Sequence, residues 1–510
     1  MGLDLAIGIA RSGLAATQRA LAQASQNIAN AQTEGYTRKR IDAQAQDAGG
    51  QPQGVRSPAA RRDVDLALLA ERDARGAAAA AAGVRETLLA GIEAIQGRPE
   101  DGATLGNALG KLRETFTALR AAPADPELAR AVFRRAEDTA RHFQDSAGAI
   151  QTARQQAQQG IVDEVKLAND GLRHIAELSG LIQSTLASGG SAADLEDKRD
   201  IAIARLAGTV PVRALRQADG GVVLVGRNGL SLPLPTRDED MLSTMPAQAG
   251  ASSYYGAGGS LPGVMLGRQD ITQQLTGGKL AENITLRDRV LPRMQAELDV
   301  AAVELAGRLD AQGLRLFTDA GGQLPDRLGG YVAGGQAGFA LTIRVNPSLA
   351  PNALAVRDGT HAVAGGPGGP TGFTPNPPGG PAGFTAMIDR VLDHALGDSA
   401  APGTPWGTIA SAGLGPDGTL ISSLTTARSV EDYATQLVRA QTEARAEATS
   451  ARATATAMQA GIASRIDRQS GVDPDAEMAA MVQLQNAYAA NARVLSTAQA
   501  MWDALLGAIR

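Results

Sequence analysis

The sequence predicts a mainly α-helical protein with a β insertion, built from terminal coiled-coil helices, an elongated helical bundle and β-rich outer domains. Two observations support this fold class. Apolar residues recur at steps of three and four in the first and last thirty residues, which is the spacing of a coiled-coil seam. Between the ends, long helical patterns alternate with short β-rich runs bounded by glycine and proline. The two ends of the chain are therefore expected to meet.

The first thirty residues predict a helix of roughly 40 Å with one narrow apolar stripe. Its seam includes Leu3, Ile7, Leu14, Leu21 and Ile28. Such a helix is marginal in isolation, because nucleation is costly and the stripe has nothing to bury against. We therefore expect an assembly element that is disordered in the monomer and becomes ordered on assembly.

The stretch NIANAQTEGYTRKR, residues 27–40, follows this helix. Gly35 is suited to the left-handed conformation that stops a helix, which would place Tyr36 where it packs back on Ala31. Asn30 offers an earlier stop, because asparagine also tolerates that conformation. The basic residues then follow the negative end of the helix dipole. These features predict a hinge between the assembly helix and the body, with the motif residues Asn27, Asn30, Gly35 and Tyr36.

The last thirty residues predict a second assembly helix. Asp473 suits its N-cap and Pro474 its first position. Asn491 interrupts the apolar seam, and two readings stay open: a buried Asn that sets register or partner number, or an Asn at a wet edge. The predicted interface residues of this helix are Met481, Leu484, Tyr488, Asn491, Leu495, Trp502 and Leu505.

The interior divides by composition. A long helical run extends from about 126 to 187, and a further helix starts near Ser429. Residues 339–346, FALTIRVN, are predicted to form a strand. The predicted domains are a terminal coiled-coil domain (1–45 with 472–510), a helical bundle (55–207 with 275–320 and 425–471), a small β-rich segment (208–274) and a variable Gly/Pro-rich β outer domain (320–424).

A charged stretch, DLEDKRD, begins at residue 194. Asp194 and Lys198 are spaced i, i+4, and Glu196 and Arg199 are spaced i, i+3. On an exposed helix each such pair contributes only about 0.2 to 0.5 kcal/mol. We therefore interpret the stretch as a solvated helix face without an acid or base role.

The sequence offers no catalytic, cofactor-binding or metal-binding candidates. The four histidines are widely separated, cysteine is absent, and neither a P-loop nor a nucleophile elbow is present. A net charge of -5, with acids interspersed among bases, does not favour nucleic acid as a partner. No segment has the ~20 apolar residues of a membrane span, and we expect no secretory signal peptide. The sequence therefore predicts no enzyme, no cofactor, no membrane contact, and export by another route.

Two terminal motifs resemble those of bacterial flagellar axial proteins. They are SQNIANAQTEGYTRKR at 25–40 and MAAMVQLQNAYAANARVLSTAQAMWDALL at 478–506. Two interior stretches, DLEDKRDIAIARLAG at 194–208 and a longer one at 277–313, resemble hook-associated protein 1, the FlgK family. Residues 320–424 have no counterpart in this resemblance.

The resemblance implies a structural protein of the flagellum. Such proteins leave the cell through the flagellar type III export channel and form a ring of subunits at the junction of hook and filament. Their terminal helices form the inner core of a tube, the bundle lies outside it, and the β domain lies on the outer surface. Implied partners are the hook protein, the next junction protein, other copies of the chain, and an export chaperone on the C-terminal helix.

Two rival interpretations remain. Another axial protein, such as a hook or rod subunit, is expected to have a middle that is β-rich throughout. A secreted enzyme or adhesin displayed by the β insertion is expected to keep its activity without the terminal helices. A generic coiled-coil scaffold does not account for the Asn-Gly-Tyr ending of the first helix.

Overall fold

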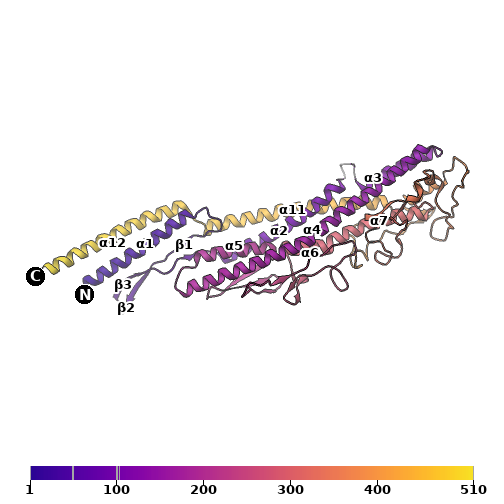
Figure 1. Ribbon diagram of the computed structural model, residues 1–510. Coiled ribbons are helices and arrows are strands. Elements are labelled where there is room, and N and C mark those ends of the chain that lie inside the picture. The colour runs from indigo at the N-terminus through magenta and orange to yellow at the C-terminus, as the bar shows by residue number, and fades with distance from the viewer. Residues whose placement is uncertain (1, 49–50, 99–101, 103, 509–510) are drawn as a thin grey trace.

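The computed structural model describes residues 2–48, 51–98, 102 and 104–508. The molecule is elongated, with a two-helix tail at one end, a long helical body, and a lobe of loops and short helices at the other end (Figure 1). Both termini lie at the tip of the tail, so the predicted meeting of the two ends is confirmed. The fold is mainly α with β insertions, as the sequence predicted.

The tail consists of α1 (Gly2–Ala29) and α12 (Pro474–Ala508), which run antiparallel. The predicted cap of α12 is confirmed, because Asp473 Oδ1 accepts hydrogen bonds from the N–H groups of Asp475 and Ala476 at 3.0 and 3.3 Å. A hairpin of β2 (Gln44–Ala48) and β3 (Gln51–Arg56) lies beside α1.

The body is a bundle of long helices. Its longest member, α4, spans Pro126–Ala187 as predicted and is roughly 90 Å long. Its Asp125 cap and Pro126 start follow the usual helix signals, and Ser429 caps α11 in the same way. The other members are α2 (Leu66–Gln96), α3 (Leu105–Ala121), α5 (Ala193–Thr209), α6 (Gly278–Thr285), a π-helical segment (Leu286–Val290), α7 (Leu291–Ala311) and α11 (Val430–Ser470).

Short antiparallel strands cover one side of the body. They are β5 (Val212–Arg216), β6 (Val222–Gly226) and β7 (Ser231–Leu232) in one sheet, and β8 (Leu242–Ser243), β9 (Met265–Leu266) and β10 (Gln269–Asp270) in another. Two side chains of α4 donate hydrogen bonds to backbone carbonyls of this region. Asn169 donates to Leu242 O at 2.8 Å, and Gln155 donates to Ala247 O at 3.1 Å.

The predicted strand at 339–346 is largely wrong. Phe339–Thr342 forms a helical turn, α8, and only β12 (Arg344–Val345) pairs, with β11 (Phe317–Thr318). Side chains explain the difference, because Asp299 of α7 draws the N–H groups of Gly338 and Ala340 into hydrogen bonds of 2.8 and 2.9 Å. The rest of 320–424 is mostly loop, with η4 (Pro347–Leu349), α9 (Ala355–Asp358), α10 (Ala386–Arg390), a π-helical turn (Val391–Ala395), β13 (Ser399–Ala401) and β14 (Thr404–Pro405).

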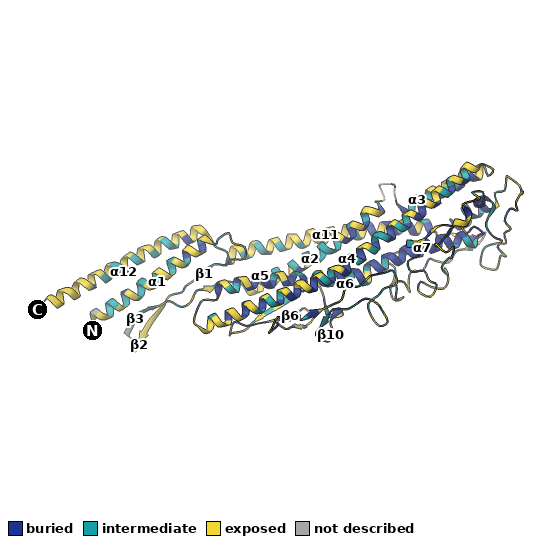
Figure 2. Ribbon diagram, in the orientation of Figure 1, coloured by how far each residue is buried: buried dark blue, intermediate teal, exposed yellow. Residues whose placement is uncertain are grey.

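The central helix α7 is buried along almost its whole length, in contrast with the tail helices (Figure 2). Its core contacts include residues of the bundle and of the 320–424 segment in one hydrophobic cluster. Buried polar groups reinforce the attachment, since Glu297 accepts from Ser422 Oγ at 2.8 Å and Gln312 Nε2 donates to Ala400 O at 2.8 Å. The 320–424 segment is therefore packed onto the bundle core.

Within the described part of the chain, no helix combines the length and apolar content that crossing a bilayer needs.

Candidate functional site

The tail pairs α1 with α12 through a seam of side-chain contacts. Gln18 Nε2 lies 3.4 Å from Tyr488 Oη, and Ser25 Oγ lies 3.5 Å from Met481 Sδ. Residue numbers rise along one helix as they fall along the other, so the two helices are antiparallel. The predicted faces of both helices therefore meet each other within one chain.

Most predicted seam residues are only half-buried by this pairing. Full burial is reached by small residues, namely Ala10, Ala24 and Ala498. Trp502 and Leu505 stay exposed, at 37% and 54%. The half-buried members are Ile7, Leu14, Leu21, Ile28, Met481, Leu484, Tyr488, Asn491 and Leu495, whereas the side chain of Leu3 lies outside the described residues. Two helices alone thus leave much of the apolar surface of the tail uncovered.

Asn491 lies in the seam and faces Gly13 of α1, which has no side chain. A Cβ added at Gly13 would lie 3.2 Å from both terminal atoms of Asn491. Because Gly13 has no side chain, it leaves room for the amide, which is half-buried. A role of Asn491 in setting register stays a prediction.

Helix α1 ends before the position that was predicted from Gly35. It stops at Ala29, where the Asn30 side chain donates from Nδ2 to Gln26 O at 2.9 Å and satisfies a carbonyl of the last turn. Gly35 has the predicted left-handed φ of 73°, but it closes the loop that follows the helix. Among the described residues only glycines have positive φ, so Asn30 ends α1 without the left-handed conformation.

Because Gly35 lies beyond the helix end, Tyr36 does not take the expected place behind Ala31. Its hydroxyl donates to Asn27 Oδ1 at 2.9 Å, and Lys39 Nζ lies 3.2 Å from the centre of its ring. Burial raises the pKa of Tyr36, which keeps the phenol protonated as a donor. The tyrosine therefore belongs to a polar contact at the base of the tail.

Asn27 joins three segments at that base. It is 1% exposed, and its Nδ2 donates to Lys39 O at 3.0 Å and to Glu477 Oε2 at 3.2 Å. Arg38 completes the contact, with its Nε 2.6 Å from the other oxygen of Glu477. One amide thus connects the end of α1, the start of α12 and the segment that leads to the body.

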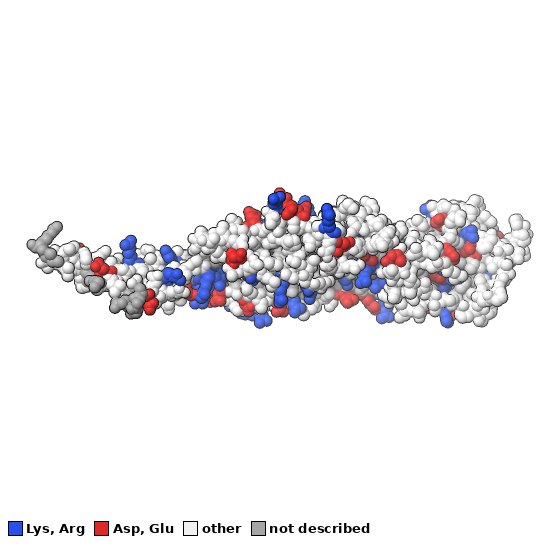
Figure 3. All heavy atoms as spheres, turned by 90° about the horizontal axis from the view of Figure 1, so that it is seen from below, with Lys and Arg blue, Asp and Glu red and all other residues white. Residues whose placement is uncertain are grey.

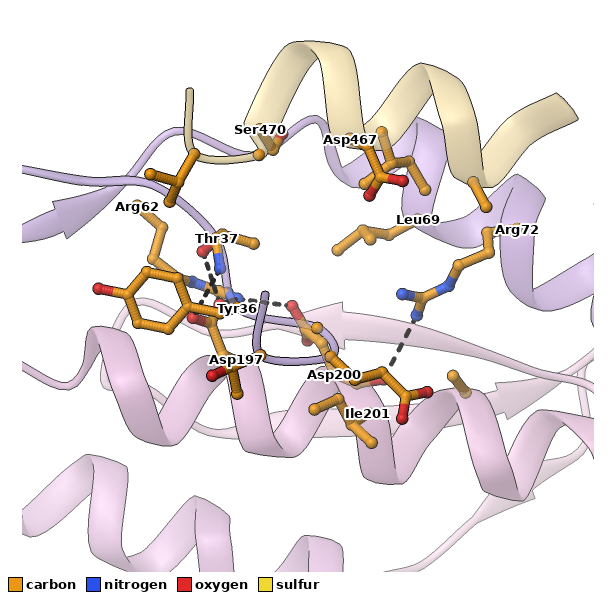
Figure 4. A pocket seen from close by; sticks show the side chains of 18 of the residues that line it. Tyr36, Thr37, Arg62, Leu69, Arg72, Asp197, Asp200, Ile201, Asp467 and Ser470 are labelled. Carbon is orange, nitrogen blue, oxygen red and sulfur yellow. Dashed lines mark hydrogen bonds and ion pairs between the residues drawn. The ribbon is translucent and has the colours of Figure 1, made fainter. Parts of the chain in front are cut away.

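The predicted solvated face of α5 is only partly right. Asp194 and Lys198 are exposed, but Arg199 is buried and the carboxylates bind cations from elsewhere in the chain. Asp197 accepts from Thr37 Oγ1 at 2.6 Å and from Arg62 Nη1 at 2.9 Å (Figure 4). It also accepts from Lys39 Nζ at 2.8 Å. Asp194 also binds Lys39, at 2.8 Å. The segment after α1 folds back over α5, so Asp197 is covered, whereas Asp194 remains 55% exposed.

Arg62 occupies the centre of this arrangement. It lies on β4 (Arg61–Arg62), which pairs with β1 (Lys39–Arg40), and it contacts Glu196 at 2.9 Å and Asp200 at 2.8 Å in addition to Asp197. We call the group formed by Thr37, Lys39, Arg62, Asp194, Glu196, Asp197 and Asp200 the elbow cluster.

The charges of the elbow cluster compensate one another in a buried setting. Burial lowers the pKa of Arg62, but the attraction of Asp200 and hydrogen bonds to Asp200 and Asp197 outweigh it and raise the pKa above its ordinary value. Burial likewise opposes the charge of Lys39, while its hydrogen bonds to Asp194 and Asp197 raise its pKa. Removing one partner therefore leaves buried charge uncompensated.

A cleft of about 760 Å³ lies beside the elbow cluster, between the loop of residues 31–37 and helices α2, α5 and α11 (Figure 4). Gly35 borders it closely, because a Cβ there would lie 2.6 Å from Ile201 of α5. Burial raises the pKa of Asp73 in the same cleft, although Arg72 opposes this. The left-handed φ and this close approach both require glycine at position 35.

Sequence reasoning identified Asn27, Gly35 and Tyr36 but missed the contacts that Thr37, Lys39 and Arg62 make with α5. The signal was present in the acidic run that begins at Asp194, but its partners Lys39 and Arg62 are more than 130 residues distant in sequence. Among the described residues, no group of three or more His, Cys, Asp or Glu side chains is placed to hold a metal ion. The site joins the tail to the body through buried ion pairs.

Comparison with known proteins places the tail in a defined class. Residues 7–37 match the family model "Flagella basal body rod protein", and residues 465–508 match the C-terminal model of the flagellar basal body rod FlgEFG proteins. These two segments contain α1 with its ending, and α12. The chain is therefore a flagellar structural protein of the axial class.

The body narrows the class to one family. Residues 90–324 match the model of the helical domain of the flagellar hook-associated protein FlgK. Over this part of the body, the chain is similar to the FlgK family of flagellar hook-associated proteins.

A solved structure of the flagellar hook junction protein FlgK from Burkholderia pseudomallei is similar to this chain, with 22% identity and a TM-score of 0.41. The match covers 50% of this chain and 45% of that one, so the chain matches less than half the length of that protein. No curated protein matches the chain.

Proposed function

We propose that the chain is a structural adaptor at the junction between flagellar hook and filament, where copies assemble as a tubular ring through their terminal helices. The match of residues 90–324 to the FlgK helical domain carries this proposal, because rod-type segments alone are shared with rod and hook proteins. The half-buried seam of the tail supports it, since the apolar surface needs further partners.

The partners follow from this placement. They are other copies of the chain, the hook protein on one side, the next hook-associated junction protein on the other, and an export chaperone on α12 before assembly. Localisation at the hook–filament junction after type III export, and a role without catalysis, belong to the same proposal. We also propose the four domains with the boundaries that the sequence predicted.

The surface charge agrees with a protein partner. On the face drawn in Figure 3, basic and acidic side chains alternate along the body, and no large area of one sign is present. Such a surface does not favour a polyanion, whose binding needs a continuous basic footprint.

Deletion of the gene in its flagellated host tests the proposal. Hooks are expected to form, and filament protein is expected in the medium as unpolymerised subunits. The full-length chain should restore filaments, whereas Leu484→Ser in the seam should not, with the exposed neighbour change Gln485→Ser as the control. Normal filaments on the deletion strain, or restoration by Leu484→Ser at the wild-type level, argue against the proposed function.

A further inference from the structure

A small cavity lies where helices α2, α7 and α11 meet in the body. Its volume is about 10 Å³, and its apolar walls include four side chains that are each more than nine-tenths buried, namely Leu89, Ile92, Met294 and Val438. A buried water molecule needs roughly this much space, about 10 to 15 Å³. The cavity therefore has room for one water and for nothing larger.

Two buried amide side chains also line this cavity, and neither completes its hydrogen bonds within the described part of the chain. Gln96, the last residue of α2, is 6% exposed, and its Nε2 has no partner there. Gln441 of α11 is 8% exposed, and neither its Nε2 nor its Oε1 has a partner there. A buried polar atom without a hydrogen bond is costly and uncommon in folded proteins. These three atoms therefore point to a polar ligand in the cavity.

The two amides lie opposite each other across the α2–α11 pair. Helix α2 begins and helix α11 ends at the cleft beside the elbow cluster, so these neighbouring helices run antiparallel (Figure 1). Glu93 Oε2 of α2 lies 3.9 Å from Arg445 Nε of α11, which fixes the register. Gln96 follows Glu93 by about one helical turn, and Gln441 precedes Arg445 by about one turn. The same register therefore places Gln96 opposite Gln441.

We propose that one water molecule occupies this cavity and links Gln96 of α2 to Gln441 of α11. The water accepts hydrogen bonds from Gln96 Nε2 and Gln441 Nε2, and it donates one to Gln441 Oε1. Three hydrogen bonds are the usual number for a buried water. A metal cation does not match these atoms, because two of the three are N–H donors. Water matches them, because it both accepts and donates.

The water bridge holds α11 on the bundle at the end far from the tail. Helix α11 runs from this cavity to the base of the tail, where Ser470 O accepts a hydrogen bond from Arg38 N at 2.8 Å. Small side chains such as Ala77 and Ala448, both at most 2% exposed, are buried elsewhere on α2 and α11. The bridge therefore adds a directional polar contact to a closely packed helix pair. This inference does not rest on the proposed function.

A crystal structure of the full-length chain, at a resolution that shows ordered water, tests the site directly. The expected result is a single solvent peak within hydrogen-bond distance of both amide side chains. An empty cavity overturns the proposal. A direct hydrogen bond between Gln96 Nε2 and Gln441 Oε1, with no solvent peak, also overturns it.

Three full-length variants, Gln96→Leu, Gln441→Leu and the double variant, test the bridge in solution by denaturant unfolding followed by circular dichroism. Each single variant removes one side of the bridge and leaves the other amide incompletely paired, so we expect the folding equilibrium constant to fall about ten-fold. The double variant leaves neither amide behind. Its loss should therefore be at least about three-fold smaller than the product of the two single losses.

Gln469→Leu, at an exposed position of α11, is the matched control and should leave the folding equilibrium constant nearly unchanged. Single losses that multiply in the double variant show that the two amides are not linked, and they overturn the bridge. Single losses no larger than that of the control overturn it as well.

Discussion

Helix α7 is richer in charged residues than helix α12, yet α7 is the more deeply buried of the two. Helix α7 has six charged residues among 21, yet it is buried on nearly all sides. Helix α12 has only four among 35, yet most of its residues are exposed. The comparison shows that apolar composition alone does not decide burial within one chain. The charges of α7 find partners inside the molecule, whereas the apolar side chains of α12 need another molecule.

Asp299 shows how α7 holds the body together. It is fully buried, and it accepts hydrogen bonds from Tyr331 Oη at 2.8 Å and from the N–H groups of Gly338 and Ala340. Asp299→Ala leaves these three donors and Gln295 Nε2, which lies 3.0 Å from Asp299 Oδ1, without their acceptor. We expect it to lower the free energy of unfolding by about 4 kcal/mol. Denaturant unfolding followed by circular dichroism measures this, with Asp310→Ala at the partly exposed end of α7 as control. A loss no larger than that of the control contradicts the anchoring role.

The elbow cluster gives the next largest effect. Arg62→Gln leaves the carboxylates of Glu196, Asp197 and Asp200 without their shared cation, which we expect to cost about 3 kcal/mol. The adjacent Arg61, 77% exposed, provides a matched control, and Arg61→Gln should change stability by less than about 0.5 kcal/mol. Spin labels on single cysteines in tail and body should also report a broader distance distribution for Arg62→Gln. Equal behaviour of the two variants would show that the cluster does not fix the tail.

The contribution of Asp299 to the free energy of unfolding should depend on pH. Burial raises the pKa of Asp299 to about 6 in the folded chain, although hydrogen bonds to Gly338 and Ala340 oppose the shift. The folded state therefore binds this proton more tightly than the unfolded state, whose pKa is about 4. Stability from this group is fully present below pH ~4 and is lost as pH rises through ~6, by up to about 3 kcal/mol.

The measurement is the free energy of unfolding of the natural chain relative to Asp299→Asn across this range. Because the variant cannot titrate at position 299, the difference between the two chains isolates the group. A difference that does not change between pH 4 and 7 contradicts the shift.

Gly35→Val should have the smallest effect on the body and a clear effect on assembly. The positive φ and the nearby Ile201 side chain both oppose a β-branched residue, at a cost of about 1 to 2 kcal/mol. We expect the loop to shift and filaments to be lost, while the bundle keeps its unfolding midpoint. Filaments at the wild-type level with Gly35→Val would show that the loop geometry is not needed.

Helix-level features were largely predictable from the sequence, because local signals determine them. The seven-residue repeats, the Asp473 cap and the run from 126 to 187 each depend on residues close together in the chain. The elbow cluster was not predictable in this way. Its cations at Lys39 and Arg62 and its carboxylates on α5 meet only because the chain returns to the same place after more than 130 residues.

The 320–424 segment shows the same limit. Its glycines and prolines correctly indicated loops, but the strand predicted at 339–346 gave way to a turn around the buried carboxylate of Asp299. Nothing in the local pattern of that segment signals an anchor on another helix. Long-range polar contacts therefore determine local structure that the periodicity of the sequence does not predict.

Hydrogen exchange, compared between dilute monomer and assembled chain, tests most directly whether tail and body differ in their need for partners. We predict that amides of α7 are protected in both states, and that amides of α1 and α12 exchange rapidly in the monomer and become protected on assembly. Strong protection of α1 and α12 in the dilute monomer, unchanged on assembly, would contradict this account.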